Sequence, residues 1–300
     1  MHKRLSPATV FLLAMPPLLW ASNAVVGRLV HSLVSPMTLN FLRWSVALVA
    51  MLPLGWMVLR RGSPMWPRWR RYALLGLFGI GSYNALQYLA LQTSQPLNVT
   101  LVGAGTPMWM LLVGRCCFGA PVRPAQAAGA VLSMVGVLVV LAHGSFDALF
   151  ALRLVPGDAF MVLATVVWSF YSWLLVRPTA DTDPLRHDWA AFLTAQIFFG
   201  TLWAGLFAGG EWAAGAAHVE IGWPVLAAVV YVGVFPAVIA FRSFNAGIDR
   251  VGPAFASFFI NLTPLYAALL SAAFLGEMPH AYHAAAFALI VAGIAVSSRR

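Results

Sequence analysis

Long apolar segments follow one another along this chain and constrain its fold more than any other feature. Ten segments are each close to the length of about 20 residues that a helix needs to cross the hydrocarbon core of a bilayer. They cover roughly residues 8–30, 36–59, 72–94, 96–118, 124–143, 157–177, 188–208, 223–245, 253–275 and 281–297. Short stretches with Gly, Pro or Ser separate them. Because 61% of the 300 residues are hydrophobic and only 9% are charged, we predict an all-α integral membrane protein with ten transmembrane helices.

The first of these segments follows a positively charged start, Met1-His2-Lys3-Arg4, as the core of a secretory signal peptide would. Its apolar run from Ala8 to Val30 is longer than the roughly 7–15 residues of such a core, and many further segments follow it. We therefore expect this segment to be the first membrane helix.

The sequence repeats itself at an interval of 157 residues. Thr106-Pro107 lines up with Thr263-Pro264, and no gap is needed over more than forty residues. The other matched pairs are Pro96 with Pro253, Gly119 with Gly276, and Gly136 with Gly293. A period close to half the length of the chain indicates two structural halves rather than an array of small repeats.

Each half contains five of the predicted helices. We expect a first five-helix repeat at 1–145, a second at 157–297 and a cytoplasmic tail at 298–300. An odd number of crossings makes the second half start on the opposite side of the membrane, so the halves are predicted to be inverted relative to each other. Inverted repeats are typical of secondary transporters, which bind substrate near the middle of the membrane.

Basic residues predict the orientation of the helices. With both ends of the chain on one side of the membrane, fourteen Lys and Arg residues lie on that side, and only Arg28 and Arg153 lie on the other. Basic loops stay in the cytoplasm. We therefore expect a multi-pass protein of the cell inner membrane, surrounded by membrane lipid, with both termini in the cytoplasm. The same distribution accounts for the net charge of +9 without nucleic acid as a partner.

The motifs that carry chemistry are missing from the sequence. The two cysteines, Cys116 and Cys117, are adjacent in an apolar run and lack the spacing of a metal site or a disulfide framework. An HxxxD spacing occurs once, from His143 to Asp147 at the end of a predicted segment, and there is no DDxxD motif and no Ser or Cys with a plausible His partner. We therefore expect no catalytic residue, metal or cofactor. An integral-membrane lipid-modifying enzyme is the main competing class, followed by a channel or a scaffold.

Prolines lie near the middle of two repeat-related segments. Pro107 and Pro264 each lack an N–H and free the carbonyl group four residues earlier, which belongs to Gly103 or Ile260. Within a membrane such carbonyl groups are buried in protein or face a wet cavity. The pair therefore predicts a substrate cavity near the midplane, with a kink needed only for packing as the alternative.

Polar and aromatic side chains collect at the same predicted depth. Aromatic rings there offer flat apolar walls with polar edges, which suit a small amphipathic solute. The alternative is that each residue joins helices, as Ser, Thr, Asn and Gln often do in membranes. The expected substrate-binding residues are Trp20, Asn23, Arg43, Tyr83, Gln87, Thr106, Trp109, Trp168, Tyr171, Asn261, Thr263 and Tyr266.

Arg43 is the most informative single residue of this set. It lies roughly 10 Å into the second segment at 1.5 Å per residue. A guanidinium group there costs at least about 2.5–3.5 kcal/mol unless it finds a partner or water. We expect Arg43 to bind a substrate carboxylate, and the alternative is that it snorkels outward or binds carbonyl groups at a helix end. Arg242 lies nearer the cytoplasmic end of its segment, and we expect no function for it.

Carboxylates are confined to the ends of the segments, as Asp158, Asp188 and Glu277 are. A carrier driven by protons or sodium usually has a carboxylate inside the membrane. Its absence from the segment centres favours facilitated diffusion or exchange, unless coupling uses a histidine or backbone carbonyl groups.

Taken together, these motifs resemble the drug/metabolite transporter superfamily, in particular its EamA-type ten-helix exporters. The resemblance covers nearly the whole chain and depends on the order and spacing of the matching residues. They are Trp20-Ala21-Ser22-Asn23, Pro36 with Arg43, Thr106-Pro107 with Gly119, Asn261-Leu262-Thr263-Pro264 with Gly276-Glu277, and Gly293. Ala120 departs from the family pattern, which often has an acidic residue there. We therefore interpret Glu277 as a structural cap at a helix end.

The resemblance implies export of small metabolites across the inner membrane, with a small-molecule substrate. The Trp and Tyr residues near the middle of the segments make the chain similar to the aromatic amino-acid exporters of that superfamily. We therefore expect export of amino acids, aromatic ones included, by alternating access around a midplane cavity without a strong intramembrane proton relay. The alternative is a proton-coupled exporter of drugs or other metabolites.

Overall fold

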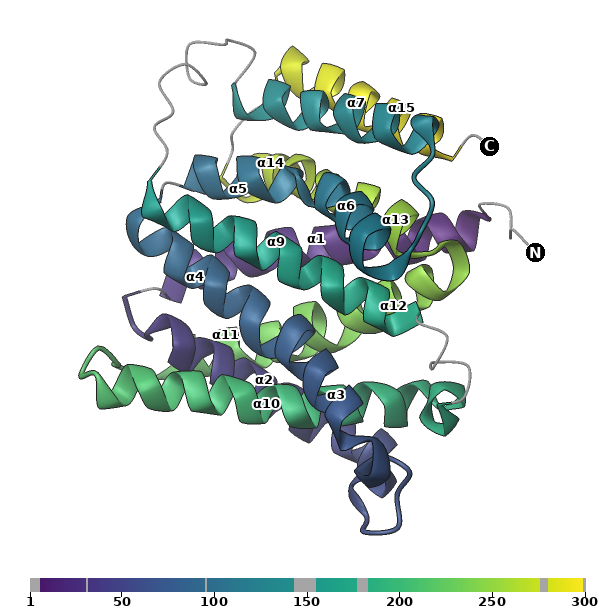
Figure 1. Ribbon diagram of the computed structural model, residues 1–300. Coiled ribbons are helices and arrows are strands. Elements are labelled where there is room, and N and C mark those ends of the chain that lie inside the picture. Colours follow the sequence, from purple (N-terminus) through teal and green to yellow (C-terminus); the bar gives the residue numbers. More distant parts are fainter. Residues whose placement is uncertain are drawn as a thin grey trace.

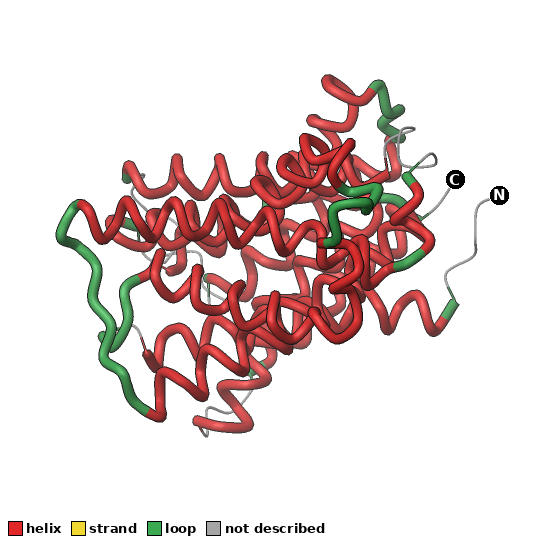
Figure 2. The backbone as a smooth tube through the Cα atoms, turned by 90° about the horizontal axis from the view of Figure 1, so that it is seen from below, coloured by secondary structure: helices red, strands yellow, loops and turns green. Residues whose placement is uncertain are grey.

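The computed structural model describes residues 6–30, 32–94, 96–142, 155–176, 183–275 and 280–298. These residues form helices joined by short loops, and within them the one β-type contact is an isolated bridge between Val34 and Val219 (Figure 1). Figure 2 shows that the loops gather at the two ends of the helices. Glu277, Arg153 and most of the predicted tail lie outside the described residues.

The helices of the first half occupy the predicted segments. They are α1 (Pro7–Val30), α2 (Pro36–Gly55), α3 (Trp69–Gly76), α4 (Tyr83–Thr93), α5 (Pro96–Ala104), α6 (Thr106–Phe118) and α7 (Pro124–Leu141). A 3₁₀ turn, Trp56–Leu59, extends α2, and a π-helical segment, Leu77–Ser82, joins α3 to α4.

The second half has the same plan. Its helices are α9 (Pro156–Val176), α10 (Trp189–Ala213), α11 (Trp223–Val232), α12 (Ala240–Val251), α13 (Pro253–Ala256), α14 (Thr263–Leu275) and α15 (Ala281–Ser297). A π-helical segment, Gly233–Ile239, joins α11 to α12, and a 3₁₀ segment, Ser257–Leu262, joins α13 to α14.

Within the described residues, seven helical stretches are long and apolar enough to cross a membrane. They are Pro7–Gly27, Pro36–Leu59, Pro124–Leu141, Pro156–Val176, Trp189–Ala213, Trp223–Val251 and Pro253–Leu270, and Ala281–Ser297 is a shorter apolar helix. The remaining two predicted segments are also helical, but one contains a π-helical stretch and the other is interrupted between α5 and α6. The prediction of an all-α membrane protein is confirmed.

Prolines and glycines set many of the helix ends. Pro36, Pro124 and Pro253 begin their helices, where the missing N–H is not needed. Gly119 ends α6 with a φ of 66° and Gly252 follows α12 with a φ of 82°, values that favour glycine. The breakers visible in the sequence therefore act as expected.

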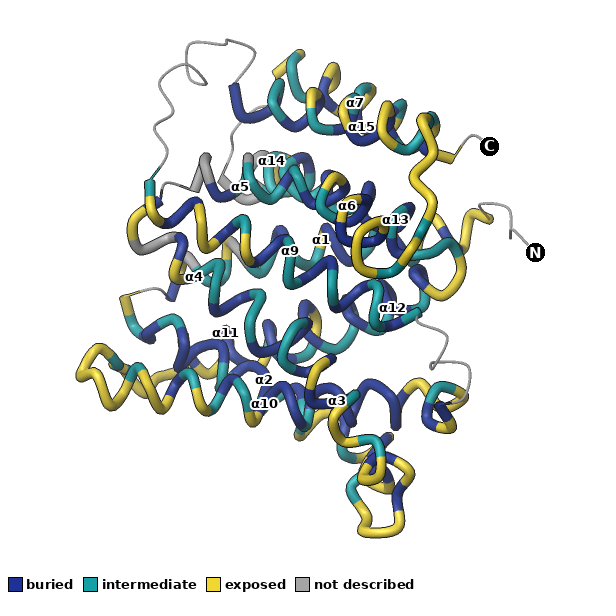
Figure 3. The backbone as a smooth tube through the Cα atoms, in the orientation of Figure 1, coloured by how far each residue is buried: buried dark blue, intermediate teal, exposed yellow. Residues whose placement is uncertain are grey.

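The distribution of polar and apolar residues is the reverse of that in a soluble protein. Large apolar side chains are exposed on the outside of the helices, for example Leu29 at 73% and Leu206 at 64% (Figure 3). Polar side chains such as Asn40, Gln196 and Asn261 are buried between the helices. This pattern is expected when the surrounding solvent is hydrocarbon, because polar groups there find partners only inside the protein.

Helices α2 and α10 lie side by side and run in opposite directions (Figure 1). Gly55, at the end of α2, lies against Thr194 near the start of α10. At the middle of the pair the Thr201 hydroxyl donates to the Trp44 carbonyl oxygen at 3.2 Å, and these two residues are 157 positions apart. The interval is that of the sequence repeat.

Helices α7 and α15 form a second antiparallel pair, visible at the top of Figure 1. A Cβ atom at Gly129 would lie 2.6 Å from the Gly293 carbonyl oxygen, and one at Gly136 would lie 2.9 Å from that of Ala286. The repeat interval of 157 residues relates Gly129 to Ala286 and Gly136 to Gly293, so the two contacts are repeat-related. Small residues therefore allow the two backbones to approach closely, as in many membrane helix pairs.

The two π-helical segments also lie at repeat-related positions. Gly76 precedes the first and would, with a Cβ atom, lie 2.5 Å from the Gly200 nitrogen in α10. Gly233 begins the second and would lie 2.8 Å from the Arg43 carbonyl oxygen in α2. The interval of 157 residues relates Gly76 to Gly233 and Arg43 to Gly200. The same close crossing therefore occurs once in each half.

Candidate substrate site

Two tryptophans from different halves meet in the interior of the helix bundle. The ring centroids of Trp20 in α1 and Trp168 in α9 are 5.4 Å apart and the rings are nearly perpendicular, at 89°. Phe244 of α12 contacts both rings, at 5.3 Å and 5.4 Å. Phe241 lies 5.5 Å from Trp168 and 6.3 Å from Trp20. The arrangement is the edge-to-face geometry that aromatic rings prefer.

Three further rings complete this group. Tyr83 of α4 and Tyr171 of α9 each lie 5.2 Å from Trp168, and Trp44 of α2 lies 5.1 Å from Phe241. Five helices therefore contribute to one set of rings. We call it the aromatic cluster: Trp20, Trp44, Tyr83, Trp168, Tyr171, Phe241 and Phe244.

The sequence predicted four members of the aromatic cluster and missed three. Trp44 directly follows Arg43, so it lies close to the predicted depth. Phe241 and Phe244 are three positions apart, which puts them on one face of a helix. That spacing is a signal that sequence reasoning could have used.

The polar end of Tyr171 is held by two amide side chains. Its hydroxyl lies 3.1 Å from Gln196 Oε1 and 3.1 Å from Asn245 Oδ1. The ring is accommodated by the π-helical segment of the first half, where a Cβ atom at Gly79 would lie 2.5 Å from it. Tyr171 is fully buried. Its hydroxyl therefore connects α9 to α10 and α12, and its ring lies next to Trp168.

The Thr-Pro pairs satisfy the carbonyl groups that their prolines free. The Thr106 hydroxyl donates to the Gly103 carbonyl oxygen at 2.6 Å, and the Thr263 hydroxyl donates to the Ile260 carbonyl oxygen at 2.6 Å. These groups are therefore bonded within their own helices. This local bonding corresponds to the alternative that the sequence left open, a kink needed for packing, and the cavity stays a prediction.

Asn261 connects two helical segments rather than pointing into the aromatic cluster. Its Nδ2 donates to the Ser133 hydroxyl of α7 at 2.9 Å, and the side chain is 1% exposed. Its Oδ1 is buried without a hydrogen-bond partner. Asn261 therefore joins two helices, which is the alternative that the sequence left open for the polar residues of the predicted site.

The remaining predicted residues lie around these features. Tyr266 of α14 is half-buried and contacts the same hydrophobic core as the aromatic cluster. Trp109 is half-buried beside the interruption at Gly105. Asn23 of α1 and Gln87 of α4 are half-buried, each on a helix that contributes a ring to the cluster.

Arg43 is sealed inside the protein. Arg43 is 1% exposed, and its Nε and Nη1 atoms have no hydrogen-bond partner. The guanidinium carbon lies 5.1 Å above the Trp44 ring, and the Tyr88 hydroxyl of α4 interacts with the group. Snorkelling outward, the alternative that the sequence left open, does not occur in this structure.

Carboxylates of the described residues lie at helix ends and in loops, as the sequence predicted. Asp158, near the start of α9, accepts a hydrogen bond from the Ser94 hydroxyl after α4. Glu211, near the end of α10, accepts from the hydroxyls of Ser35 and Thr38 at 2.7 Å and 2.9 Å, and so caps α2. These carboxylates join helices.

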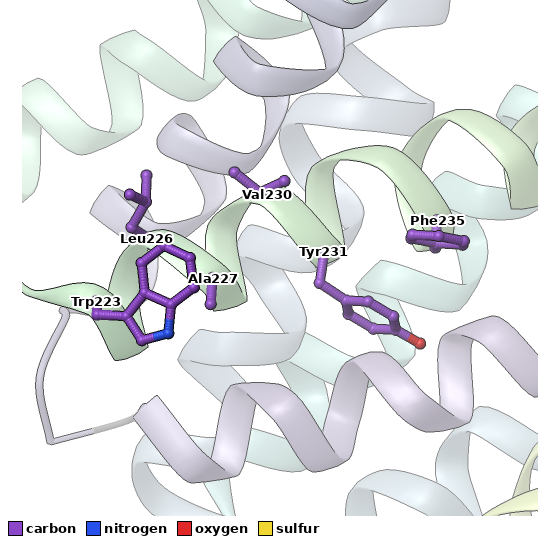
Figure 4. Close-up of a pocket in the computed structure, with 6 residues that line it drawn as sticks. All are labelled: Trp223, Leu226, Ala227, Val230, Tyr231 and Phe235. Atoms are coloured by element: carbon purple, nitrogen blue, oxygen red, sulfur yellow. The ribbon is translucent and has the colours of Figure 1, made fainter.

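A shallow groove lies on the outside of α11 (Figure 4). It is lined by Trp223, Leu226, Ala227, Val230, Tyr231 and Phe235. The rings of Tyr231 and Phe235 are stacked at 5.2 Å, and Trp223 is 76% exposed. No charged side chain is among these residues, so the groove is a surface for hydrocarbon and not a polar substrate site.

Comparison with known proteins agrees with this arrangement. The EamA-like transporter family matches the chain twice, over residues 7–142 and 155–299. An uncharacterized transporter from Archaeoglobus fulgidus is 23% identical over 298 residues, which cover 97% of this chain and 98% of the relative. The aromatic amino acid exporter YddG from Ancylobacter novellus is 29% identical over 245 residues, which cover 81% of this chain and 79% of the exporter.

A solved crystal structure has the same fold. It is 24% identical in sequence, superimposes with a TM-score of 0.74, and the alignment covers 98% of this chain and 97% of the other. The likeness therefore extends over the whole helix bundle. Because the family match accounts for nearly every residue, the protein belongs to the EamA-like transporter family.

Proposed function

We propose that this transporter exports amino acids, including aromatic ones, across the cell inner membrane. Membership of the EamA-like transporter family supports a transporter, and the relative named as an aromatic amino acid exporter supports the substrate class. The observation that carries the proposal is the contact between Trp20 and Trp168, which joins two family-matched segments in the middle of the bundle.

The proposed architecture is ten membrane helices in two inverted five-helix repeats, at 1–145 and 157–297, with both termini in the cytoplasm. Two antiparallel helix pairs support it, because α2 and α10, and likewise α7 and α15, are related by the repeat interval. In Figure 1, α1 begins and α15 ends at the same end of the bundle, which agrees with an even number of crossings.

In the proposed cycle, the two halves rock against each other around the aromatic cluster. Its rings fill the space between the helices in this conformation, so a substrate enters by separating α1 from α9 and taking the place of ring–ring contacts. An aromatic amino acid offers the same kind of apolar surface. The Trp168 indole N–H is buried without a hydrogen-bond partner and provides a donor for such a substrate.

The proposed walls of the substrate path around these rings are Asn23, Gln87, Trp109 and Tyr266. Arg43 is proposed to attract a carboxylate. Thr106, Thr263 and Asn261 have local hydrogen bonds, so their proposed part is to shape the helices that line the path.

The proposed transport is exchange or facilitated diffusion. The described carboxylates lie at helix ends and none of them reaches the aromatic cluster, which supports this mode over a proton relay. A proton-coupled exporter of drugs or other metabolites is the second candidate. It predicts accumulation against a gradient.

The test is transport by the purified full-length protein in proteoliposomes, with radiolabelled phenylalanine, tryptophan, threonine and methionine, with and without a pH gradient. We expect saturable movement of the aromatic amino acids that does not depend on the gradient. Trp168→Ala should reduce it strongly, while Trp223→Ala, which removes a lipid-facing tryptophan, should not. Accumulation driven by the gradient would favour the second candidate, and movement of none of the four would reject the amino-acid proposal.

A further inference from the structure

One face of α2 has three buried side chains with polar atoms that lack a hydrogen-bond partner. Asn40, Arg43 and Trp44 stand at positions i, i+3 and i+4, so they point to the same side of the helix. Asn40 and Arg43 are each 1% exposed and Trp44 is fully buried. Both amide atoms of Asn40, the Nε and Nη1 atoms of Arg43 and the Nε1 atom of Trp44 have no hydrogen-bond partner.

Such a group of unpartnered atoms is unusual. Buried polar atoms in proteins are hydrogen-bonded in the large majority of cases, and each exception needs an explanation. Here, five such atoms occur within two turns of one helix. A missing binding partner explains the four atoms of Asn40 and Arg43 together, whereas four separate packing defects would each destabilise the protein.

The charge of Arg43 points to the nature of that partner. Elsewhere in the described chain, Arg71 and Arg186 form ion pairs with Asp183 and Asp249. No described carboxylate lies within 4.0 Å of Arg43. Tyr88 offers only a neutral hydroxyl. A buried charge without an opposite charge is strongly unfavourable, so an anion is the expected partner.

We propose that Asn40, Arg43 and Tyr88 form a binding site for the carboxylate group of the transported molecule, here called the carboxylate site. A planar carboxylate matches the guanidinium group, and the Asn40 amide adds a further donor for its oxygens. The Asn40 Oδ1 atom can also accept a hydrogen bond from an amino group on the same molecule. One positive charge suits a carboxylate better than a doubly charged phosphate group.

The carboxylate site lies at the edge of the aromatic cluster. Trp44, next to Arg43, contacts Phe241 at 5.1 Å. On α4, Tyr88 is five residues beyond Tyr83, whose ring is 5.2 Å from Trp168. A molecule with a carboxylate at one end and an apolar group at the other therefore has a place for each. This inference rests on the proposed function for the path by which substrate arrives.

The first experiment measures binding and not transport. The thermal unfolding midpoint of the detergent-solubilised protein is followed with 3-phenylpropionate and with its neutral analogue 3-phenylpropionamide. We expect the carboxylate to raise the midpoint and the amide to leave it unchanged. A wild-type protein that responds equally to both, or to neither, would overturn the carboxylate site.

Variants then assign the effect to Arg43. Arg43→Gln should abolish the preference for the carboxylate. Arg242→Gln is the matched control, because Arg242 is also an arginine within a predicted membrane helix, but it is half-buried and stacks 4.7 Å from the Trp189 ring. That control should keep the preference. Retention of the preference in Arg43→Gln would overturn the assignment.

The unfolding midpoint of Arg43→Gln without ligand is a further test. An unpartnered buried charge destabilises the empty protein, so Arg43→Gln should raise the unfolding midpoint without ligand. A strong fall would mean that Arg43 has a structural role instead. Asn40→Ala provides a second variant that keeps the charge, and it should weaken 3-phenylpropionate binding about tenfold, as expected for the loss of one hydrogen bond to a charged group.

Transport separates this inference from the proposed function. If 3-phenylpropionate stabilises the protein through Arg43 but no amino acid moves in proteoliposomes, the carboxylate site stands and the amino-acid proposal fails. If phenylalanine moves equally well in the wild type and in Arg43→Gln, the amino-acid proposal stands and the carboxylate site is rejected.

Discussion

Thr201 donates a hydrogen bond to the carbonyl oxygen of Trp44, and the two residues are related by the interval of 157 residues at which the sequence repeats. Two residues related by a twofold axis contact each other only where the axis passes between them. The proposed inversion of the halves therefore puts the axis at this hydrogen bond and, by the same reasoning, between α7 and α15. Both pairs are antiparallel, as an axis in the plane of the membrane requires.

The close approach of α7 and α15 predicts the effect of a larger residue at Gly129. A Cβ atom there would lie 2.6 Å from a backbone oxygen, which cannot move aside easily. We expect Gly129→Val to destabilise the protein by about 1–3 kcal/mol or to prevent folding, as overpacking does. Gly209→Val is the control, because nothing lies within 4 Å of a Cβ atom at that position. The measurement is the thermal unfolding midpoint in detergent, and equal midpoints for the two variants would contradict the contact.

The hydroxyl of Tyr171 predicts a second loss of stability. Tyr171→Phe leaves the amide oxygens of Gln196 and Asn245 without this donor in a buried position. We expect destabilisation of about 1–3 kcal/mol, the cost of an unsatisfied buried polar group. Tyr231→Phe, in the exposed groove, removes a single contact to the Ser22 hydroxyl and should cost less. The two variants are compared by their unfolding midpoints, and a larger loss in Tyr231→Phe would reverse this ranking.

The hydrogen bonds of the Thr-Pro pairs predict that the threonine hydroxyl, and not the rest of the side chain, contributes to stability. Thr263→Val removes the donor to the Ile260 carbonyl oxygen and should destabilise the protein by about 0.6 kcal/mol, a typical value for one hydrogen bond within a membrane protein. Thr263→Ser keeps the donor and should restore stability. Transport in proteoliposomes should follow stability in both variants. Loss of transport in Thr263→Ser at normal stability would instead point to direct contact with substrate.

The hydrogen bonds that Glu211 accepts from the first turn of α2 predict that its charge stabilises the protein. Its carboxylate accepts hydrogen bonds from the hydroxyls of Ser35 and Thr38 and from the backbone N–H of Thr38 at 2.9 Å. Glu211→Gln removes the charge that strengthens these bonds, and we expect a loss of about 1–2 kcal/mol. Glu220→Gln, on an exposed residue of the following loop, is the control and should be neutral. Unfolding midpoints compare them, and equal stability would exclude a capping role.

The extent of the helices along the chain could be predicted from this sequence, because a crossing helix needs a fixed length of apolar residues and its prolines and glycines mark where it begins or bends. For that reason the predicted segments correspond to helices, and Trp20, Tyr83, Trp168 and Tyr171 meet in one cluster.

The rotation of each helix about its axis could not be predicted in the same way. In a soluble helix, one apolar face identifies the buried side, but here both the lipid-facing and the interior sides are apolar. Trp44 was therefore indistinguishable from a lipid-facing residue, and the spacing of Phe241 and Phe244 placed them on one face of a helix without showing which way that face turns. Asn261 shows the same difficulty, because its side chain turns toward Ser133 and not toward the aromatic cluster.

The π-helical segments were also invisible in the sequence, because their extra residue per turn follows from contacts made by other helices. The ring of Tyr171 occupies the space left by Gly79, and that residue is far away in the chain. No local pattern of the third segment encodes this contact.

These two π-helical segments divide the helices that contain them between different neighbours. Before the first segment α3 lies mainly against α10, and after it α4 lies mainly against α9. After the second segment α12 lies mainly against α1, whereas α11 before it contacts both α2 and α1. A π-helical turn inside an α-helix is rare and is found frequently at functional sites. The change of neighbour from α10 to α9 therefore takes place within a π-helical turn, so one irregular turn of the first half lies between two different helices of the second half.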